Sequence, residues 1–182
     1  MAAGVQYLAL LRGVNVGGKN LVKMSELRAA FEAMQFRDVA TYIQSGNVLF
    51  HAPRQQRDQL TARIESQLGR RFGAELKVVL LTKAQLKAVV DGAPRGFGGD
   101  SYLCDVIFLR KPLTAREAFS LVEIKKGVDR AWAGTGVLYF SRLGSKASSS
   151  RLSKIVARPE YQNMTIRSWS TTTKLLARMD AQ

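Results

Sequence analysis

The sequence predicts an α+β protein of two ferredoxin-like lobes, each built on an antiparallel sheet, with a helix at the C-terminus. Three observations predict this class. Short apolar runs typical of buried strands alternate with segments whose apolar residues recur every three or four positions, as on one face of a helix. The order of these segments before residue 82 is βαββαβ, the ferredoxin-like arrangement. After the Gly/Pro-rich residues 91–100 the order starts again as βαββαβα, so we expect lobes over residues 1–91 and 92–182.

The elements of the first lobe follow from its apolar spacing. Strands are expected at Val5–Leu11, 39–44, 47–51 and 76–81, with a tight hairpin turn at Ser45-Gly46. Ser25 is expected to cap the first helix and Gly73 to end the second. The inward positions of these helices are Leu27, Ala30, Phe31 and Met34, then Leu60, Ile64, Leu68 and Phe72. A capping box of Thr82 and Gln85 opens a short third helix.

The second lobe begins with an expected strand over Tyr102–Leu109, and a capping box of Thr114 and Glu117 opens the next helix. Two further strands are expected at 128–132 and 137–141. A Ser-capped helix is expected from about Ser149, followed by an extended piece over 164–168. The last helix has inward positions at Thr172, Leu175, Leu176 and Met179.

Composition excludes several classes of protein. With 46% hydrophobic and 23% charged residues among 182, the chain is globular and not disordered. The first apolar run is short and lacks a basic leader, which favours a cytoplasmic protein without a membrane span. Cys104 is the only cysteine and His51 the only histidine, so a disulfide, a Cys/His nucleophile pair and a His-rich metal site are disfavoured. Cys104 lies within a strand, where we expect a packed thiol and no metal site.

The net charge of +14 arises from 28 basic and 14 acidic residues. A field of this sign indicates anionic partners, or no more than solubility. Residues 139–179 carry eight basic side chains and a single acid, Glu160. The strongest positive field is therefore expected from the C-terminal quarter.

A Gly-rich segment follows directly on the first strand and reads Leu11-Arg-Gly-Val-Asn-Val-Gly-Gly-Lys-Asn20. Glycine lets another group approach backbone amides closely, and the neighbouring cations add positive charge. The segment is either an anion-binding loop or a rigid surface turn whose asparagines cap nearby backbone. Its candidate ligand-binding residues are Arg12, Asn15, Gly17, Gly18, Lys19 and Asn20.

The same segment approaches the P-loop pattern, because four residues separate Gly13 from Gly18-Lys19. Asn20, however, stands where Ser or Thr would reach Mg²⁺. The helical spacing also begins only near Ser25, so no helix start would face a phosphate at the lysine. A nucleoside-triphosphate P-loop is therefore disfavoured.

The expected hairpin carries a second group of polar residues. Gln44, Ser45 and Asn47 surround its turn, with Tyr42 just before them. These side chains either hydrogen-bond within the turn or contact a ligand, and the pattern favours neither.

A basic segment near the C-terminus supplies the remaining candidates. Arg151, Lys154 and Arg158 are expected on one helical face, although such a stripe is usually solvated surface. Residues 171–173 are expected to present free amides at a helix start, and Trp169 is either an aromatic plate for the ligand or part of the core. The candidate ligand-binding residues here are Arg151, Lys154, Arg167, Trp169, Thr171 and Lys174.

Four blocks together resemble one protein family. They are Leu10-Leu-Arg-Gly-Val-Asn-Val-Gly-Gly-Lys-Asn20, Thr41-Tyr-Ile-Gln-Ser-Gly-Asn-Val48, Ser150-Arg-Leu-Ser-Lys154 and Thr165-Ile-Arg-Ser-Trp-Ser-Thr-Thr-Thr-Lys-Leu175. The family is the bacterial one catalogued as domain of unknown function 1697, and its members are described as uncharacterised. Where the family usually has asparagine, this chain has Ser168 and Ser170, and serine replaces only part of an amide's hydrogen bonding.

These patterns predict a protein that binds a phosphate-bearing ligand, either nucleic acid or a nucleotide-like small molecule. The expected site is a cleft between the Gly-rich segment and the segment Arg167 to Lys174. One alternative is an enzyme acting on a phosphorylated metabolite, with Arg12 and Lys19 stabilising charge. The other is a protein-interaction module that uses an exposed sheet. No cofactor, catalytic residue or oligomeric state is assigned.

Overall fold

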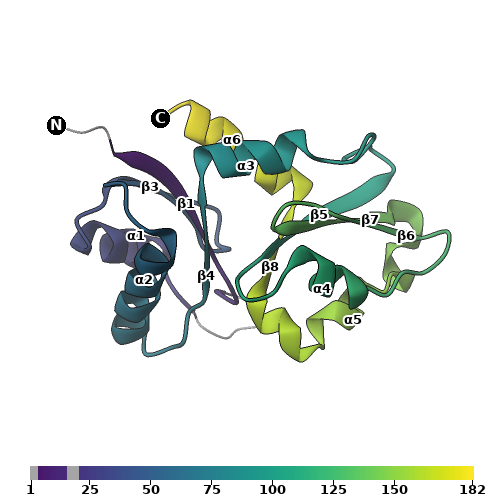
Figure 1. Ribbon diagram of the computed structural model, residues 1–182, viewed down its shortest axis with the longest axis horizontal. Helices are drawn as coiled ribbons and strands as arrows, with labels where there is room; N and C mark the ends of the chain where they lie inside the picture. Colours follow the sequence, from purple (N-terminus) through teal and green to yellow (C-terminus); the bar gives the residue numbers. More distant parts are fainter. Residues whose placement is uncertain (1–3, 16–20) are drawn as a thin grey trace. The chain divides into compact units, whose positions relative to one another are not determined.

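The computed structural model describes residues 4–15 and 21–182, and the chain divides into two compact units. Unit 1 comprises Met1–Leu86 with Ala181–Gln182, and unit 2 comprises Lys87–Asp180. Within the described residues each unit contains a four-stranded antiparallel sheet (Figure 1), which confirms the predicted α+β class. The domain limits at residues 91 and 92 stay a prediction.

Unit 1 has the predicted order βαββαβ. Its elements are β1 (Val5–Leu11), α1 (Met24–Ala33), β2 (Arg37–Tyr42), β3 (Asn47–Ala52), α2 (Arg57–Phe72) and β4 (Val78–Thr82), and α3 (Lys83–Asp91) leads from it into unit 2. The strand order is β2-β3-β1-β4, so β1 lies in the middle and pairs antiparallel with both β3 and β4. This is the strand order of the ferredoxin-like arrangement.

Helices α1 and α2 cover one face of the unit 1 sheet. Leu27 and Phe31 from α1 are fully buried there, as are the predicted inward leucines and isoleucine of α2. The ring of Phe50 on β3 lies 5.2 Å from that of Phe31 and 4.6 Å from that of Phe36. Burying one such ring stabilises a fold by about 2 kcal/mol.

The opposite face of β1 is buried as well. Leu8 and Leu10 point away from α1 and α2, yet both are 0% exposed, and Leu49 beside them is 1% exposed. A strand buried on both faces reads as a continuous apolar run, which is how Val5–Leu11 appears in the sequence. Because both faces of β1 are buried, this strand gives no support to the alternative of an interaction module that uses an exposed sheet.

The helix ends agree with the sequence signals in two places and differ in one. Gly73 ends α2 in the left-handed conformation and donates its N–H to the Gly69 carbonyl at 2.9 Å. Thr82 and Gln85 form the predicted capping box at α3. The prediction that Ser25 caps α1 is wrong, because the helix begins one residue earlier, at Met24, and no side chain caps it.

The hairpin joining β2 to β3 has a longer turn than predicted. The turn occupies residues 43–46, and both Ile43 (φ 50°) and Gly46 (φ 73°) are left-handed. Strand β2 therefore ends at Tyr42, two residues earlier than predicted, whereas β3 begins at Asn47 as predicted. A Cβ atom at Gly46 would lie 2.9 Å from the Cβ of Leu11. Glycine is therefore required here by its φ angle and by the close approach of β1.

Unit 2 repeats the sheet arrangement. Beyond α3 its elements are β5 (Tyr102–Leu109), α4 (Ala115–Ser120), β6 (Asp129–Ala133), β7 (Val137–Leu143), α5 (Leu152–Val156), β8 (Met164–Ser168) and α6 (Trp169–Asp180). Two 3₁₀ helices, Gly144–Ser149 and Pro159–Asn163, flank α5. The strand order is β6-β7-β5-β8, so β6 and β8 form opposite edges of the sheet.

The two faces of the unit 2 sheet pack differently. On one face, Ile107, Leu138 and Phe140 contact Ala118 of α4 and Ile155 of α5. The other face carries an aromatic cluster in which the ring of Phe97 meets three further rings edge-on, those of Trp132, Tyr139 and Trp169. The sheet is thus covered on both sides, and the 91–100 segment predicted as a boundary supplies part of the cover.

One predicted element of unit 2 is wrong in its extent. The helix expected from Ser149 is interrupted: a 3₁₀ helix ends at Ser149, and α5 spans only Leu152–Val156 with no side-chain cap. Arg151 therefore precedes α5 and Arg158 follows it. The three cations of the predicted stripe do not share a helical face.

Among the residues that the structure describes, no helix has both the length and the apolar character needed to cross a membrane. The longest of them, α2, carries Arg57, Arg70 and Arg71 among its residues.

Candidate functional site

The central glycines of the Gly-rich segment, with Lys19 and Asn20, lie outside the described residues. The anion-binding role predicted for Gly17 and Gly18 therefore stays a prediction. A P-loop requires a helix that begins at its Gly-Lys pair. Helix α1 begins at Met24, which favours the prediction that the segment is not a P-loop.

Asn15 links the two ends of the Gly-rich segment. Its side-chain amide donates to the carbonyls of Val22 and Gln44, both at 2.9 Å, and its Oδ1 accepts the Val22 N–H at 2.8 Å. Its φ of 56° is left-handed, a conformation that asparagine tolerates better than most residues. Both amide protons are thus used within unit 1, which supports a structural role for Asn15 and leaves its amide no proton for a ligand.

Arg12 and Gly13 continue β1 into the segment. The N–H of Arg12 donates to the Lys77 carbonyl at 2.9 Å, which ties this end of the segment to the residue before β4. Gly13 has φ 68°, and no atom lies within 4 Å of the place where a Cβ would stand, so only its backbone conformation favours glycine there. The guanidinium of Arg12 is therefore carried by an anchored backbone at the edge of the segment.

The hairpin residues are held by hydrogen bonds within the turn. Asn47 is 0% exposed, and its amide donates to the Tyr42 carbonyl and to the Ser45 hydroxyl, both at 2.9 Å. The Gln44 carbonyl accepts from Asn15, while the Gln44 side chain is exposed. Of the two roles left open for this turn, the structure supplies the internal one for Asn47 and Ser45.

Arg167 is a buried cation on the edge strand β8. It is 7% exposed, and its Nη1 donates to the Thr165 hydroxyl at 2.8 Å and to the Ile166 carbonyl at 2.9 Å. Burial lowers the pKa of the guanidinium to about 10, which still leaves it charged at neutral pH. Both of these acceptors are neutral groups, and they help to orient the guanidinium.

The start of α6 is capped by Ser168, the residue after Arg167. Its hydroxyl accepts the Thr171 N–H at 3.1 Å, and the Thr172 hydroxyl donates to the Ser168 carbonyl at 2.9 Å. The expectation that residues 171–173 present free amides is therefore wrong, because α6 begins at Trp169. Serine and asparagine are comparable helix caps, so the serine at this position preserves a capping role.

Trp169 is half-buried and packs against the aromatic cluster of unit 2. Its ring centroid lies 5.2 Å from that of Phe97 at an interplanar angle of 83°. A Cβ atom at Gly98, where φ is 87°, would lie 2.4 Å from the Trp169 Nε1. The packing interpretation of this tryptophan therefore accounts for the contacts that the structure gives it, whereas Lys174 on α6 is exposed.

The basic segment around α5 is anchored away from Arg167. The Arg151 N–H donates to Asp129 Oδ2 at 2.9 Å, and Asp129 belongs to the edge strand β6. Glu123 pairs with Arg158 at 3.2 Å and lies 4.0 Å from Arg151, so part of the segment's charge is balanced. Lys154 is exposed on α5.

The part of the chain described by the structure contains no group of three His, Cys, Asp or Glu side chains able to hold a metal ion. Arg167, Ser168 and the aromatic cluster lie in unit 2, whereas Arg12, Asn15 and the hairpin lie in unit 1. Each unit thus carries some of the candidate residues.

Comparison with known proteins gives the family. The family model described as protein of unknown function (DUF1697) matches residues 5–139. The chain belongs to this family. The DUF1697 chain is also similar to a solved structure, that of conserved bacterial protein SP0830 from Streptococcus pneumoniae, with 25% sequence identity and a TM-score of 0.82 over 95% of this chain and 97% of that one. A search of curated proteins found no match.

Two residues of this DUF1697 protein have structural roles that the sequence patterns did not reveal. Gly98 lies against Trp169, although the Gly/Pro-rich segment suggested only a hinge. Asp129 is 4% exposed and accepts hydrogen bonds from two backbone amides. In the sequence, Asp129 is an acid at the start of an apolar strand. An acid at such a position is usually solvent-exposed, so the sequence did not indicate that Asp129 is buried.

Cys104 is packed, as predicted for this DUF1697 chain. It is 8% exposed, its Sγ accepts the Gly98 N–H at 3.3 Å, and burial raises the pKa of the thiol.

We expect iodoacetamide at pH 8 to label native Cys104 about 100-fold more slowly than the denatured chain, because reaction requires an exposed thiolate. Mass spectrometry of timed samples measures this ratio, and equal rates would contradict the packing of Cys104.

Proposed function

We propose that this DUF1697 protein binds a phosphate-bearing anionic ligand through two sets of donors. One set is the guanidinium of Arg167 in unit 2, and the other is the Gly-rich segment with Arg12 and Lys19 in unit 1. The observation that carries the proposal is the buried guanidinium of Arg167, oriented by the neutral acceptors Thr165 and Ile166. The net charge of +14 favours an anionic partner of either size, nucleotide or nucleic acid.

The chemistry of Arg167 suits a phosphate. A guanidinium presents several N–H donors in one plane, which match the oxygens of a phosphate group. Its charge is removed from bulk water, so its attraction for an anion is screened less than that of a surface cation. It also stands two residues before α6, whose N-terminal dipole adds positive potential.

The test is thermal unfolding with a panel of anions: pyrophosphate, ATP, a sugar phosphate and a short oligonucleotide. A ligand that binds the native state raises the melting temperature by mass action. We expect Arg167→Gln to lower the affinity for whichever ligand raises the melting temperature by about 10- to 100-fold. A hydrogen bond to a charged group contributes about 1.5–3 kcal/mol, which corresponds to this loss. Arg116→Gln, an exposed site on α4, removes the same charge from unit 2 and should leave affinity within about twofold.

The Gly-rich segment is tested separately by Lys19→Ala, with Arg54→Ala, at an exposed position of unit 1, as the charge-matched control. If both sets of donors hold one ligand, the double variant Lys19→Ala with Arg167→Gln will depart from additivity. Additive losses indicate independent sites. No stabilisation by any member of the panel, or equal losses in Arg167→Gln and Arg116→Gln, would overturn the proposal.

A further inference from the structure

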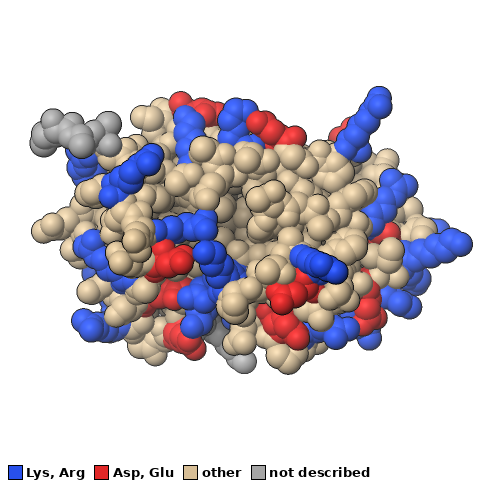
Figure 2. Space-filling view, viewed as in Figure 1, with Lys and Arg blue, Asp and Glu red and all other residues tan. Residues whose placement is uncertain are grey.

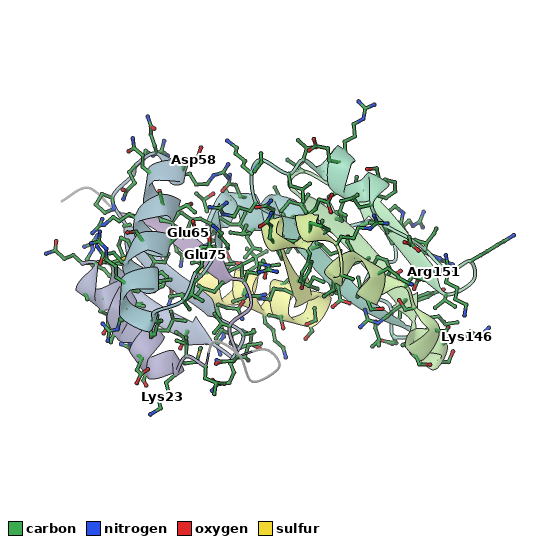
Figure 3. All side chains as sticks on the ribbon, turned by 90° about the horizontal axis from the view of Figure 1, so that it is seen from below. Lys23, Asp58, Glu65, Glu75, Lys146 and Arg151 are labelled. Carbon is green, nitrogen blue, oxygen red and sulfur yellow. The ribbon has the colours of Figure 1, made fainter. Side chains whose placement is uncertain are left out.

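A group of exposed cations gathers at the β6 edge of the unit 2 sheet. It is contributed by the loop before β6, by β6 itself, and by the 3₁₀ helix and the residues that follow it. Figure 2 shows blue side chains over this end of unit 2, and Figure 3 labels Lys146 and Arg151 at the same end. We call this surface the β6 corner and define it as Lys125, Lys126, Arg130, Lys146 and Arg151, all exposed.

A buried carboxylate fixes the corner. Asp129 Oδ2 accepts the N–H of Lys125 and the N–H of Arg151, each at 2.9 Å. These two amides are 26 positions apart in the chain, so one side chain ties two basic loops together. The Leu143 N–H donates to the Val128 carbonyl at 2.9 Å and holds the start of the 3₁₀ helix beside the same loop. The cations are therefore carried by a cross-linked backbone.

Most of the positive charge at the corner has no acid to balance it. Arg142, on the neighbouring strand, is paired with Asp105, and Arg151 lies 4.0 Å from Glu123. Within residues 4–15 and 21–182, the four remaining cations form no ion pair: Lys125, Lys126, Arg130 and Lys146. The corner thus presents several solvated positive charges along a short stretch of surface.

An aromatic ring adjoins these charges. The Arg130 guanidinium carbon lies 5.2 Å from the centroid of the Tyr102 ring, a cation–π contact between β6 and the start of β5. Such a contact restrains the long arginine side chain, so less rotamer entropy is lost when it binds. It also combines a planar cation with an aromatic side chain, the two groups on which unpaired bases stack.

We propose that the β6 corner binds the phosphodiester backbone of a nucleic acid. A solvated lysine attracts a single phosphate only weakly, because water and salt screen the charge. Phosphates repeated along a strand engage several such cations at once and release their condensed counterions. Cations spread over three segments therefore suit an extended polyanion better than a compact one.

This surface differs from the one containing Arg167. The sheet order places β6 and β8 at opposite edges, and three inter-strand spacings separate them by roughly 14 Å. Thr165 and Ile166 orient Arg167, whereas Asp129 anchors the loops of the corner. Nucleic-acid binding at the β6 corner therefore does not depend on the ligand site proposed at Arg167.

The test is fluorescence anisotropy with labelled single-stranded RNA and duplex DNA of about 20 nucleotides, at low and at physiological salt. We expect the triple variant Lys125→Gln, Lys126→Gln, Lys146→Gln to bind at least about 10-fold more weakly and to lower the salt slope by roughly 2, as expected for three lost phosphate contacts. The control Arg54→Gln, Arg70→Gln, Arg71→Gln removes the same net charge from exposed positions of unit 1 and should bind nearly as wild type.

A second variant separates position from charge. Asp129→Ala makes the protein more positive but releases both loops, and we expect it to bind nucleic acid about 5-fold more weakly, since the cations lose their common anchor. Circular dichroism checks that the sheet persists. Stronger binding of nucleic acid by Asp129→Ala would show that net charge determines the affinity and that anchoring of the two loops by Asp129 does not.

Three results would overturn the proposal: equal losses in the two triple variants, no oligonucleotide binding at low salt, or binding to vesicles of anionic lipid without binding to oligonucleotide. The triple variant at the corner should keep the rise in melting temperature caused by pyrophosphate, ATP or the sugar phosphate, and Arg167→Gln should lose it. These measurements therefore distinguish a failure of the ligand site proposed at Arg167 from a failure of the nucleic-acid surface proposed at the β6 corner.

Discussion

Gly98→Ala will destabilise unit 2 by about 3 kcal/mol, the largest loss that we expect from a single methyl group in this protein. The added Cβ would lie 2.4 Å from Nε1 and 2.5 Å from Cδ1 of Trp169, far inside van der Waals contact. Gly98 also has φ 87°, where an L-residue pays a further conformational cost. Trp169 would have to move, and its packing on Phe97 would be lost.

Chemical denaturation followed by tryptophan fluorescence measures the effect. Both tryptophans, Trp132 and Trp169, belong to unit 2, so the signal reports this unit. Gly96→Ala is the matched control, because Gly96 has φ 78° in the same loop but nothing within 4 Å of its Cβ position. We expect the control to lose only about 1 kcal/mol. Equal losses in the two variants would contradict the close approach of Trp169.

The second large effect is expected at Asn15, where Asn15→Ala should cost about 3 kcal/mol. The change removes three hydrogen bonds that together contribute about 2 kcal/mol, and it places alanine at φ 56°, which adds about 1 kcal/mol. Asn15→Gly suits that φ and should cost about 2 kcal/mol, so the pair separates side chain from backbone. Circular dichroism during guanidinium denaturation measures both.

A neighbouring substitution controls for this prediction. Asn15 bonds the backbone carbonyl of Gln44, so Gln44→Ala leaves the hydrogen bond in place and should change stability by less than about 0.5 kcal/mol. If the Gly-rich segment holds the ligand, Asn15→Gly will also weaken binding without changing the charge, because the segment's two ends are no longer joined. Wild-type stability in both Asn15 variants would refute the structural role.

The residues that agree with the sequence-based predictions have mostly local causes. The capping boxes of Thr82 and Thr114 need only side chains three residues apart, and both are present. Gly73 ends α2 because it alone meets the left-handed turn there without a Cβ penalty. Apolar spacing likewise placed the strands and the inward faces of the long helices, since burial of one face is the dominant driving force.

The predictions that were wrong depended on where a helix starts. Ser25 and Ser149 are acceptable caps by residue type, but α1 begins before Ser25 and a 3₁₀ helix occupies the residues up to Ser149. Residues 171–173 were likewise expected at a helix start that lies at Trp169. Boundaries of this kind are decided by competing hydrogen bonds that differ by a few tenths of a kcal/mol to about 1 kcal/mol.

From the amino-acid order alone came the α+β class, the βαββαβ order, the family resemblance and the excess of positive charge, because these follow from local periodicity and composition. Only the folded chain decided which polar residues are used internally. Asn15, Asn47 and Asp129 each bond partners distant in the sequence or across a turn, and Arg167 on the edge strand β8 is only 7% exposed. Such contacts depend on three-dimensional proximity, for which one sequence carries no periodic signal.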